Sequence, residues 1–166
     1  NIPRIKGCIE KLAFNFGDII SEGIYSFPTP ETIAALSSDE ISECCHVGYR
    51  CRYIEKSSKL FITKNPGISE LMKMKRDEAR KTLLEYTGVG PKVADCILLF
   101  SGIHCDSFPT DVWIKRVMEE LYFQKEVSLK EIENFAHSYF GEYAGFAQQY
   151  LFYYAREHMD ELRNIL

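Results

Sequence analysis

A chain of 166 residues with 46% hydrophobic residues is long enough to bury one sizeable core. It contains no apolar run of membrane-spanning length and no low-complexity segment, so a membrane-embedded or low-complexity protein is not expected. The formal net charge of -4 argues mildly against a general polyanion binder, because such domains are usually basic.

The cysteines and the first residue bear on the cellular compartment. Cys44 and Cys45 are adjacent, and no secretory leader precedes them, so we expect reduced thiols in the cytosol. No Cys-x-x-Cys occurs and no cysteine follows Cys105, so a metal site is not expected. Asn1 stands where an initiator methionine would, and we therefore expect a processed chain or a piece of a longer protein.

Helix signals recur along the whole chain. Hydrophobic residues at helical spacing predict a helix over residues 2–16, ended by Gly17. Thr29 and Ser37 each precede a short predicted helix as caps, and a longer helix follows Gly48. Five more helices are expected, over residues 77–86, 91–101, 110–122, 128–140 and 144–158. With few strand signals and short connections, the pattern predicts an all-α helical bundle.

Two of these helices are joined by the tight turn Gly88-Val89-Gly90-Pro91. Glycine tolerates positive φ, and proline suits the first position of a helix because it lacks an N–H. Such a helix-hairpin-helix unit exposes consecutive N–H groups at Gly88, Val89, Gly90 and the start of the second helix. These groups can hold a phosphate oxygen without reading sequence. Many Gly-x-Gly turns, however, only pack helices together.

Lys92 and Asp111 are the candidate catalytic residues. Lys92 lies in the first turn of a helix, where the dipole disfavours an ammonium group, so we expect a partly dehydrated amine. Asp111 begins the next helix, where free N–H groups keep it ionised. Each has a structural alternative, a surface lysine and a helix cap. Together they indicate a Schiff-base nucleophile and a carboxylate that stabilises an oxocarbenium-like sugar.

The run LLEYTGVGPKVADCILLFSGIHCDSFPTDVW resembles the helix-hairpin-helix, Gly/Pro-rich loop and aspartate signature of base-excision DNA glycosylases. It is most similar to the 8-oxoguanine DNA glycosylase branch, and to bacterial members in particular. NIPRI, GYRCRYI and AGFAQQYLFYYARE resemble the same branch, so the resemblance covers nearly the whole chain. It implies a bifunctional DNA glycosylase and AP lyase of base excision repair that removes 8-oxoguanine from duplex DNA without a cofactor.

The resemblance also implies roles for individual residues. Lys92 would attack C1′ of the damaged nucleotide and form a Schiff base that permits β-elimination, while Asp111 would support the positive charge on the sugar. Cys96 and Phe152 would sandwich the flipped base, and Gln148 would read its Watson–Crick edge. From the sequence pattern alone, Cys96 and Phe152 suit helix cores and Gln148 suits a surface.

Three further positions match DNA contacts of the family. Tyr49 would wedge into the base stack and Arg50 would contact the orphaned base, although a packed tyrosine at a helix start is the alternative for Tyr49. Arg4 would read cytosine opposite the lesion, because its donors suit the acceptor edge of cytosine. Trp113 stands where some members have a histidine that contacts a phosphate, so that contact is not carried over.

The expected organisation is a catalytic region over residues 1–166, formed by two helical subdomains with the active-site cleft between them. The N-terminal antiparallel β domain of the family is absent from this sequence, and with it a carbonyl that distinguishes 8-oxoguanine from guanine. The expected partner is double-stranded DNA containing oxidised guanine, bound by a monomer in the bacterial cytoplasm, at the nucleoid, with no membrane involved. The alternatives are a non-catalytic helix-hairpin-helix DNA-binding module and a glycosylase for a different lesion.

Overall fold

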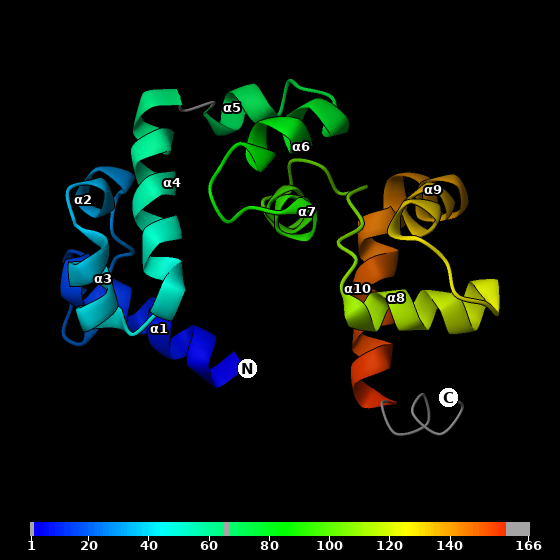
Figure 1. The fold of residues 1–166 in the computed structure, drawn as a ribbon, viewed down its shortest axis with the longest axis horizontal. Helices are drawn as coiled ribbons and strands as arrows, with labels where there is room; N and C mark the ends of the chain where they lie inside the picture. Colours follow the sequence, from blue (N-terminus) through cyan, green and yellow to red (C-terminus); the bar gives the residue numbers. More distant parts are fainter. Residues whose placement is uncertain (1, 65–66, 159–166) are drawn as a thin grey trace. The chain divides into compact units, whose positions relative to one another are not determined.

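The computed structural model describes residues 2–64 and 67–158 (Figure 1). The chain divides into two compact units. Unit 1 comprises Asn1–Gly67 and Glu85–Gly88, and unit 2 comprises Ile68–Leu84 and Val89–Leu166. Both units are built almost entirely from helices, so the predicted all-α class is confirmed.

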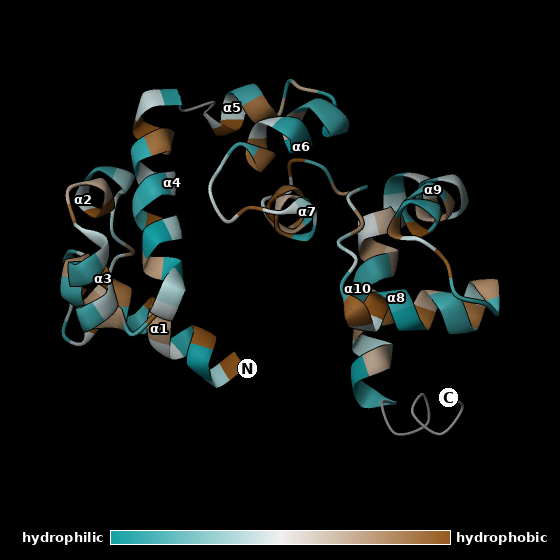
Figure 2. Cartoon of the chain, in the orientation of Figure 1, coloured by the Kyte–Doolittle hydropathy of each residue, from teal (hydrophilic) through white to brown (hydrophobic). Residues whose placement is uncertain are grey.

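Unit 1 is formed by helices and one small hairpin. Helix α4 packs against α2 and α3, and α1 packs against α3. Figure 2 shows hydrophilic and hydrophobic residues mixed along α4, as expected for a helix with one buried face. The elements are α1 (Ile2–Phe16), β1 (Ile19–Ser21), β2 (Ile24–Tyr25), α2 (Pro30–Ala34), α3 (Ser38–Cys45), the 3-10 turn η1 (Gly48–Arg50) and α4 (Cys51–Lys64).

The local signals for the helices of unit 1 are confirmed, but the hairpin was not expected. Thr29 caps α2 through the N–H of Thr32, and Ser37 forms a reciprocal capping box with Glu40 at the start of α3. In the hairpin, Ile19 pairs with Tyr25 in antiparallel register. A strand of two or three residues is too short to show an alternating hydrophobic pattern, which explains why the sequence did not reveal it.

Unit 2 contains the remaining helices. Helix α6 packs against α7, and α10 packs against both α8 and α9. The helix expected over residues 110–122 is α-helical only to Met118, after which the backbone continues as a π-helical segment. The elements are α5 (Ile68–Leu71), α6 (Arg76–Leu84), α7 (Pro91–Phe100), α8 (Val112–Met118), the π-helical η2 (Glu119–Phe123), α9 (Leu129–Phe140), the 3-10 turn η3 (Gly141–Tyr143) and α10 (Ala144–Glu157).

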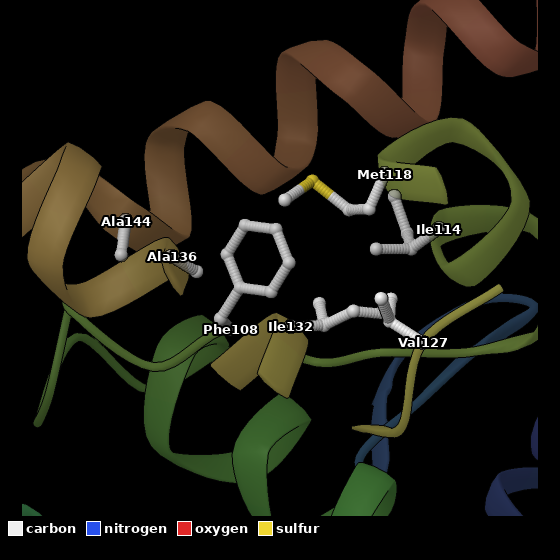
Figure 3. Packing of buried hydrophobic residues seen from close by; sticks show 7 residues of the cluster. All are labelled: Phe108, Ile114, Met118, Val127, Ile132, Ala136 and Ala144. Carbon is white, nitrogen blue, oxygen red and sulfur yellow. The ribbon is translucent and has the colours of Figure 1, made fainter. Parts of the chain in front are cut away.

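Phe108 lies at the centre of a hydrophobic cluster in unit 2. Figure 3 shows its ring among the side chains of Met118, Ile132 and Ala136, which come from α8 and α9. The ring is only 4% exposed and stacks on Phe140 with a centroid separation of 6.2 Å. Burial of this one aromatic side chain therefore anchors the loop that leads into α8, and with it the segment that contains Asp111.

Two helical glycines have opposite surroundings. At Gly145, near the start of α10, a Cβ atom would overlap the side chain of Leu99 and the carbonyl oxygen of Cys105, and would lie 2.9 Å from the carbonyl oxygen of Ser107. At Gly7, within α1, a Cβ atom would meet nothing within 4 Å. Of these two glycines, Gly145 is thus the one required by close packing against backbone.

We expect Gly145→Ala to lower the free energy of unfolding by about 1–3 kcal/mol, because the backbone oxygens must move to admit the methyl group. The control Gly7→Ala should raise it by about 0.5–1 kcal/mol, because alanine has a higher helix propensity. Urea unfolding monitored by circular dichroism measures both values. Equal effects of the two substitutions would contradict the close approach of α10 to the 105–107 loop.

Candidate active site

The turn between α6 and α7 depends on the two glycines that the sequence singled out. Gly88 has φ +87, and a Cβ atom there would lie 2.5 Å from the ring of Tyr53. Gly90 is the extended N-cap of α7, and its carbonyl accepts the N–H of Ala94 at 2.9 Å. Gly88 is therefore required both for its backbone conformation and for the space beside Tyr53.

Helix α4 holds the first part of this turn within unit 1. The Ser57 hydroxyl donates to the carbonyl oxygen of Thr87 at 2.9 Å, and Lys64 pairs with Glu85 at 2.6 Å. The Ser57–Thr87 hydrogen bond thus fixes the backbone just before Gly88 within unit 1.

Lys92 is the second residue of α7 and is exposed. The expectation of a partly dehydrated amine is therefore wrong for the chain by itself. The reason is that the whole first turn of α7, Pro91, Lys92 and Val93, is exposed among the described residues. Lys92 nevertheless lines a cavity of about 720 Å³ in unit 2, to which Thr110, the residue before Asp111, also contributes.

Asp111 is the N-cap of α8. Its Oδ1 atom accepts hydrogen bonds from the N–H groups of Trp113 at 3.0 Å and Ile114 at 2.9 Å, so the capping alternative is confirmed. Among the described residues, no hydrogen bond reaches the other carboxylate oxygen, Oδ2. Capping therefore uses Oδ1 of Asp111 and leaves Oδ2 for a second interaction.

The three residues expected to bind the base lie at different depths. Gln148 is only 5% exposed, so the surface alternative for it is wrong. Its Nε2 atom donates to the carbonyl oxygen of Pro109 at 2.9 Å, because this face of α10 packs on the loop before Asp111. Phe152 is half-buried against the Phe108 cluster, and Cys96 is half-buried on α7. None of Cys96, Gln148 and Phe152 lines the cavity that Lys92 lines.

The expected DNA contacts in unit 1 are all exposed. Tyr49 is 65% exposed, its ring meets Tyr53 edge-on, and the Arg50 guanidinium lies 4.7 Å from its centroid. This exposure speaks against a packed tyrosine. Arg4 lies on α1 and is also exposed.

Sequence reasoning missed an ion pair that joins α6 and α7, the two helices of the helix-hairpin-helix unit. Arg80 on α6 donates two hydrogen bonds to the carboxylate of Asp95 on α7, at 2.7 and 3.0 Å. Burial raises the pKa of Asp95 above its ordinary value, and the hydrogen bonds from Arg80 oppose that rise. The signal available in the sequence was one acidic residue within the apolar helix PKVADCILLF.

The comparisons with known proteins concern the family and the fold of this chain. Residues 1–141 match the HhH-GPD superfamily of base excision DNA repair proteins. The chain belongs to this superfamily. It is 33% identical over 162 residues to a probable N-glycosylase/DNA lyase of Methanothermobacter thermautotrophicus, covering 86% of this chain and 52% of that protein. None of the helices in residues 2–64 and 67–158 is long and apolar enough to cross a membrane.

Two solved structures share the fold of the HhH-GPD chain described here. One is MBOgg1 in complex with a low-affinity DNA ligand, with a TM-score of 0.87 and 43% identity over 95% of this chain and 55% of that one. The other is the Clostridium acetobutylicum 8-oxoguanine glycosylase/lyase with double-stranded DNA containing cytosine opposite 8-oxoG, with a TM-score of 0.84, 36% identity and the same coverage. The chain thus spans about half the length of the relatives that it matches.

We expect Asp95→Ala to lower the free energy of unfolding by about 3 kcal/mol, because it leaves the Arg80 charge without its main partner. A double-mutant cycle with Arg80→Ala, measured by urea unfolding, should show a coupling energy clearly above the error. The control cycle uses Lys64→Ala and Glu85→Ala, an exposed pair that should show almost no coupling. Equal coupling in the two cycles would contradict a structural role for the Arg80–Asp95 pair.

Proposed function

We propose that this protein is a bifunctional DNA glycosylase and AP lyase of base excision repair that removes 8-oxoguanine from duplex DNA. The observation that carries the proposal is the position of Lys92 in the first turn of α7, at a cavity to which the segment before Asp111 also contributes. The similarity to glycosylase/lyase relatives supports it. The protein acts as a monomer on double-stranded DNA, in the cytoplasm at the nucleoid.

Lys92 is the nucleophile in this reaction. Its uncharged amine attacks C1′, the bond to the base breaks, and the base leaves with the electron pair of that bond. The adduct loses an amine proton, the C1′–O4′ bond of the sugar ring breaks, and O4′ takes up a proton, which leaves a Schiff base at C1′. The Schiff base acidifies the proton on C2′, and loss of that proton expels the 3′ phosphate by β-elimination. Because Lys92 is exposed in the chain by itself, bound DNA supplies the surface that excludes water from this side chain.

Asp111 supports the sugar as positive charge develops on it. Its Oδ1 atom remains the cap of α8, which holds the side chain in place, and its Oδ2 atom stabilises the charge. Phe108 and Gln148 act as positioning residues for this carboxylate, since one anchors the loop before it and the other binds the carbonyl of Pro109.

The flipped base lies between Cys96 and Phe152, and Gln148 reads its edge. One N–H of the Gln148 amide is bound to Pro109, and its oxygen accepts a hydrogen bond from Gln149. The amide orientation is therefore set before any base arrives, and the second N–H and the remaining oxygen lone pair are left for recognition. Backbone N–H groups of Gly88, Val89 and Gly90 bind phosphate. Tyr49 wedges into the base stack, and Arg50 contacts the orphaned base. An active-site cleft between two helical subdomains stays a prediction.

Lys92→Gln should abolish covalent trapping by borohydride on duplex containing 8-oxoguanine, because the amide cannot form a Schiff base. Affinity for the same duplex should change by less than about tenfold, since only one cation is lost. The matched control is Lys115→Gln, an α8 lysine paired with Glu119 at 2.9 Å, which should trap like the unmodified chain.

Trapping by Lys92→Gln would exclude Lys92 as nucleophile. Absence of trapping by the unmodified chain would favour the non-catalytic DNA-binding module or, if a panel of other lesions is cleaved, a different substrate.

Excision of 8-oxoguanine should be faster opposite cytosine than opposite the other three bases by about tenfold or more, because Arg4 donors match the acceptors of cytosine. Arg4→Ala should reduce this ratio without abolishing trapping. Single-turnover rates on four duplexes that differ only at the opposite base measure the ratio. Equal rates on all four would contradict the assignment of Arg4.

A further inference from the structure

The cavity that Lys92 lines carries positive charge on an otherwise acidic chain. Five cationic side chains and three carboxylates line it, an excess of two positive charges, whereas the whole chain has a formal net charge of -4. His137 also lines the cavity. Burial is the main cause that lowers the pKa of His137, and the positive charge of Arg76 lowers it further, so the imidazole adds little charge at neutral pH.

The carboxylates of this cavity are already paired with its two arginines. Arg80 binds Asp95 through two hydrogen bonds and lies 3.7 Å from Glu133. Arg76 binds Asp77 at 2.8 Å. The acidic groups therefore neutralise the arginines and leave the lysines of the cavity uncompensated.

Those lysines come from three different helices and are all exposed. They are Lys81 on α6, Lys92 on α7 and Lys130 on α9. Among the described residues, no ion pair or hydrogen bond involves their ammonium groups. Three lysines outside this cavity, Lys59, Lys64 and Lys115, do have carboxylate partners. Three unpaired ammonium groups around one hollow form a site for anionic oxygen atoms.

We propose that Lys81 and Lys130 bind the backbone phosphates that flank the damaged nucleotide, on the strand that Lys92 attacks. The inference rests on the proposed function, because it takes Lys92 to reach C1′ of that nucleotide. Both flanking phosphates are bonded to the same sugar, so they lie beside the cavity that Lys92 lines. Lysine suits this role as a mobile point charge that neutralises phosphate without demanding one geometry. These contacts add to those of the backbone N–H groups in the Gly88–Gly90 turn.

The test measures DNA affinity as a function of salt concentration. The duplex contains 8-oxoguanine, and every protein carries Lys92→Gln so that the lesion is not consumed. The double substitution Lys81→Gln and Lys130→Gln should reduce the slope of log K against log salt by about 1.8, since each phosphate contact contributes about 0.9. The matched control, Lys64→Gln with Lys115→Gln, removes the same charge from lysines that already have partners, and should leave the slope unchanged.

An unchanged slope for the cavity variants, or an equal fall in the control, would overturn the proposal. Borohydride trapping with Lys92 intact separates this outcome from failure of the proposed function. Retained trapping together with an unchanged slope refutes the phosphate site alone. A reduced slope without trapping shows that these lysines bind DNA phosphate but refutes the chemistry, and with it the position of those phosphates beside the attacked sugar. Since Lys81 and Lys130 are exposed, both variants should unfold at the same urea concentration as the parent chain.

Discussion

The tight connection between α6 and α7 is the constraint on which the candidate site depends. Gly88 adopts a positive φ, and the ring of Tyr53 leaves no room for a Cβ atom there. Gly90 is the extended N-cap of α7, and Pro91 is the first residue of that helix. Within unit 1, the Ser57 hydroxyl of α4 holds the backbone at Thr87, directly before this turn. Gly88 and Lys92 are both exposed, and Val89 and Gly90 are partly exposed.

A second set of contacts places the carboxylate. Phe108 is buried among side chains of α8 and α9, and Gln148 of α10 binds the carbonyl of Pro109 two residues before Asp111. These contacts come from parts of the chain that are far apart in sequence. The N-cap hydrogen bonds of Asp111 then fix one of its oxygens. The buried ring of Phe108, the amide of Gln148 and the N-cap hydrogen bonds together hold the Asp111 side chain in place.

Charge on this protein is distributed in a way that its net value hides. The two arginines of α6 stabilise the fold, since Arg76 and Arg80 are paired with carboxylates from the same unit. The lysines at the same cavity have no such partners in the part of the chain that the structure describes, and they are exposed on three helices. A protein with a negative net charge can in this way present a locally basic surface. Salt screens charges that lie farther from a phosphate than the Debye length, so the nearby lysines dominate the electrostatic field at that phosphate.

The sequence by itself determined most helices, the caps at Thr29 and Ser37, the hairpin turn and the family. Hydrophobic spacing, capping residues and Gly-Pro turns are local signals, readable over a few positions. Only the tertiary structure decided that Lys92 is exposed, that Gln148 is buried against Pro109, and that Asp95 pairs with Arg80. It also decided the hairpin at residues 19–25, which is too short to leave a pattern. Burial and pairing depend on what segments distant in sequence bring to a residue, and no local pattern contains that information.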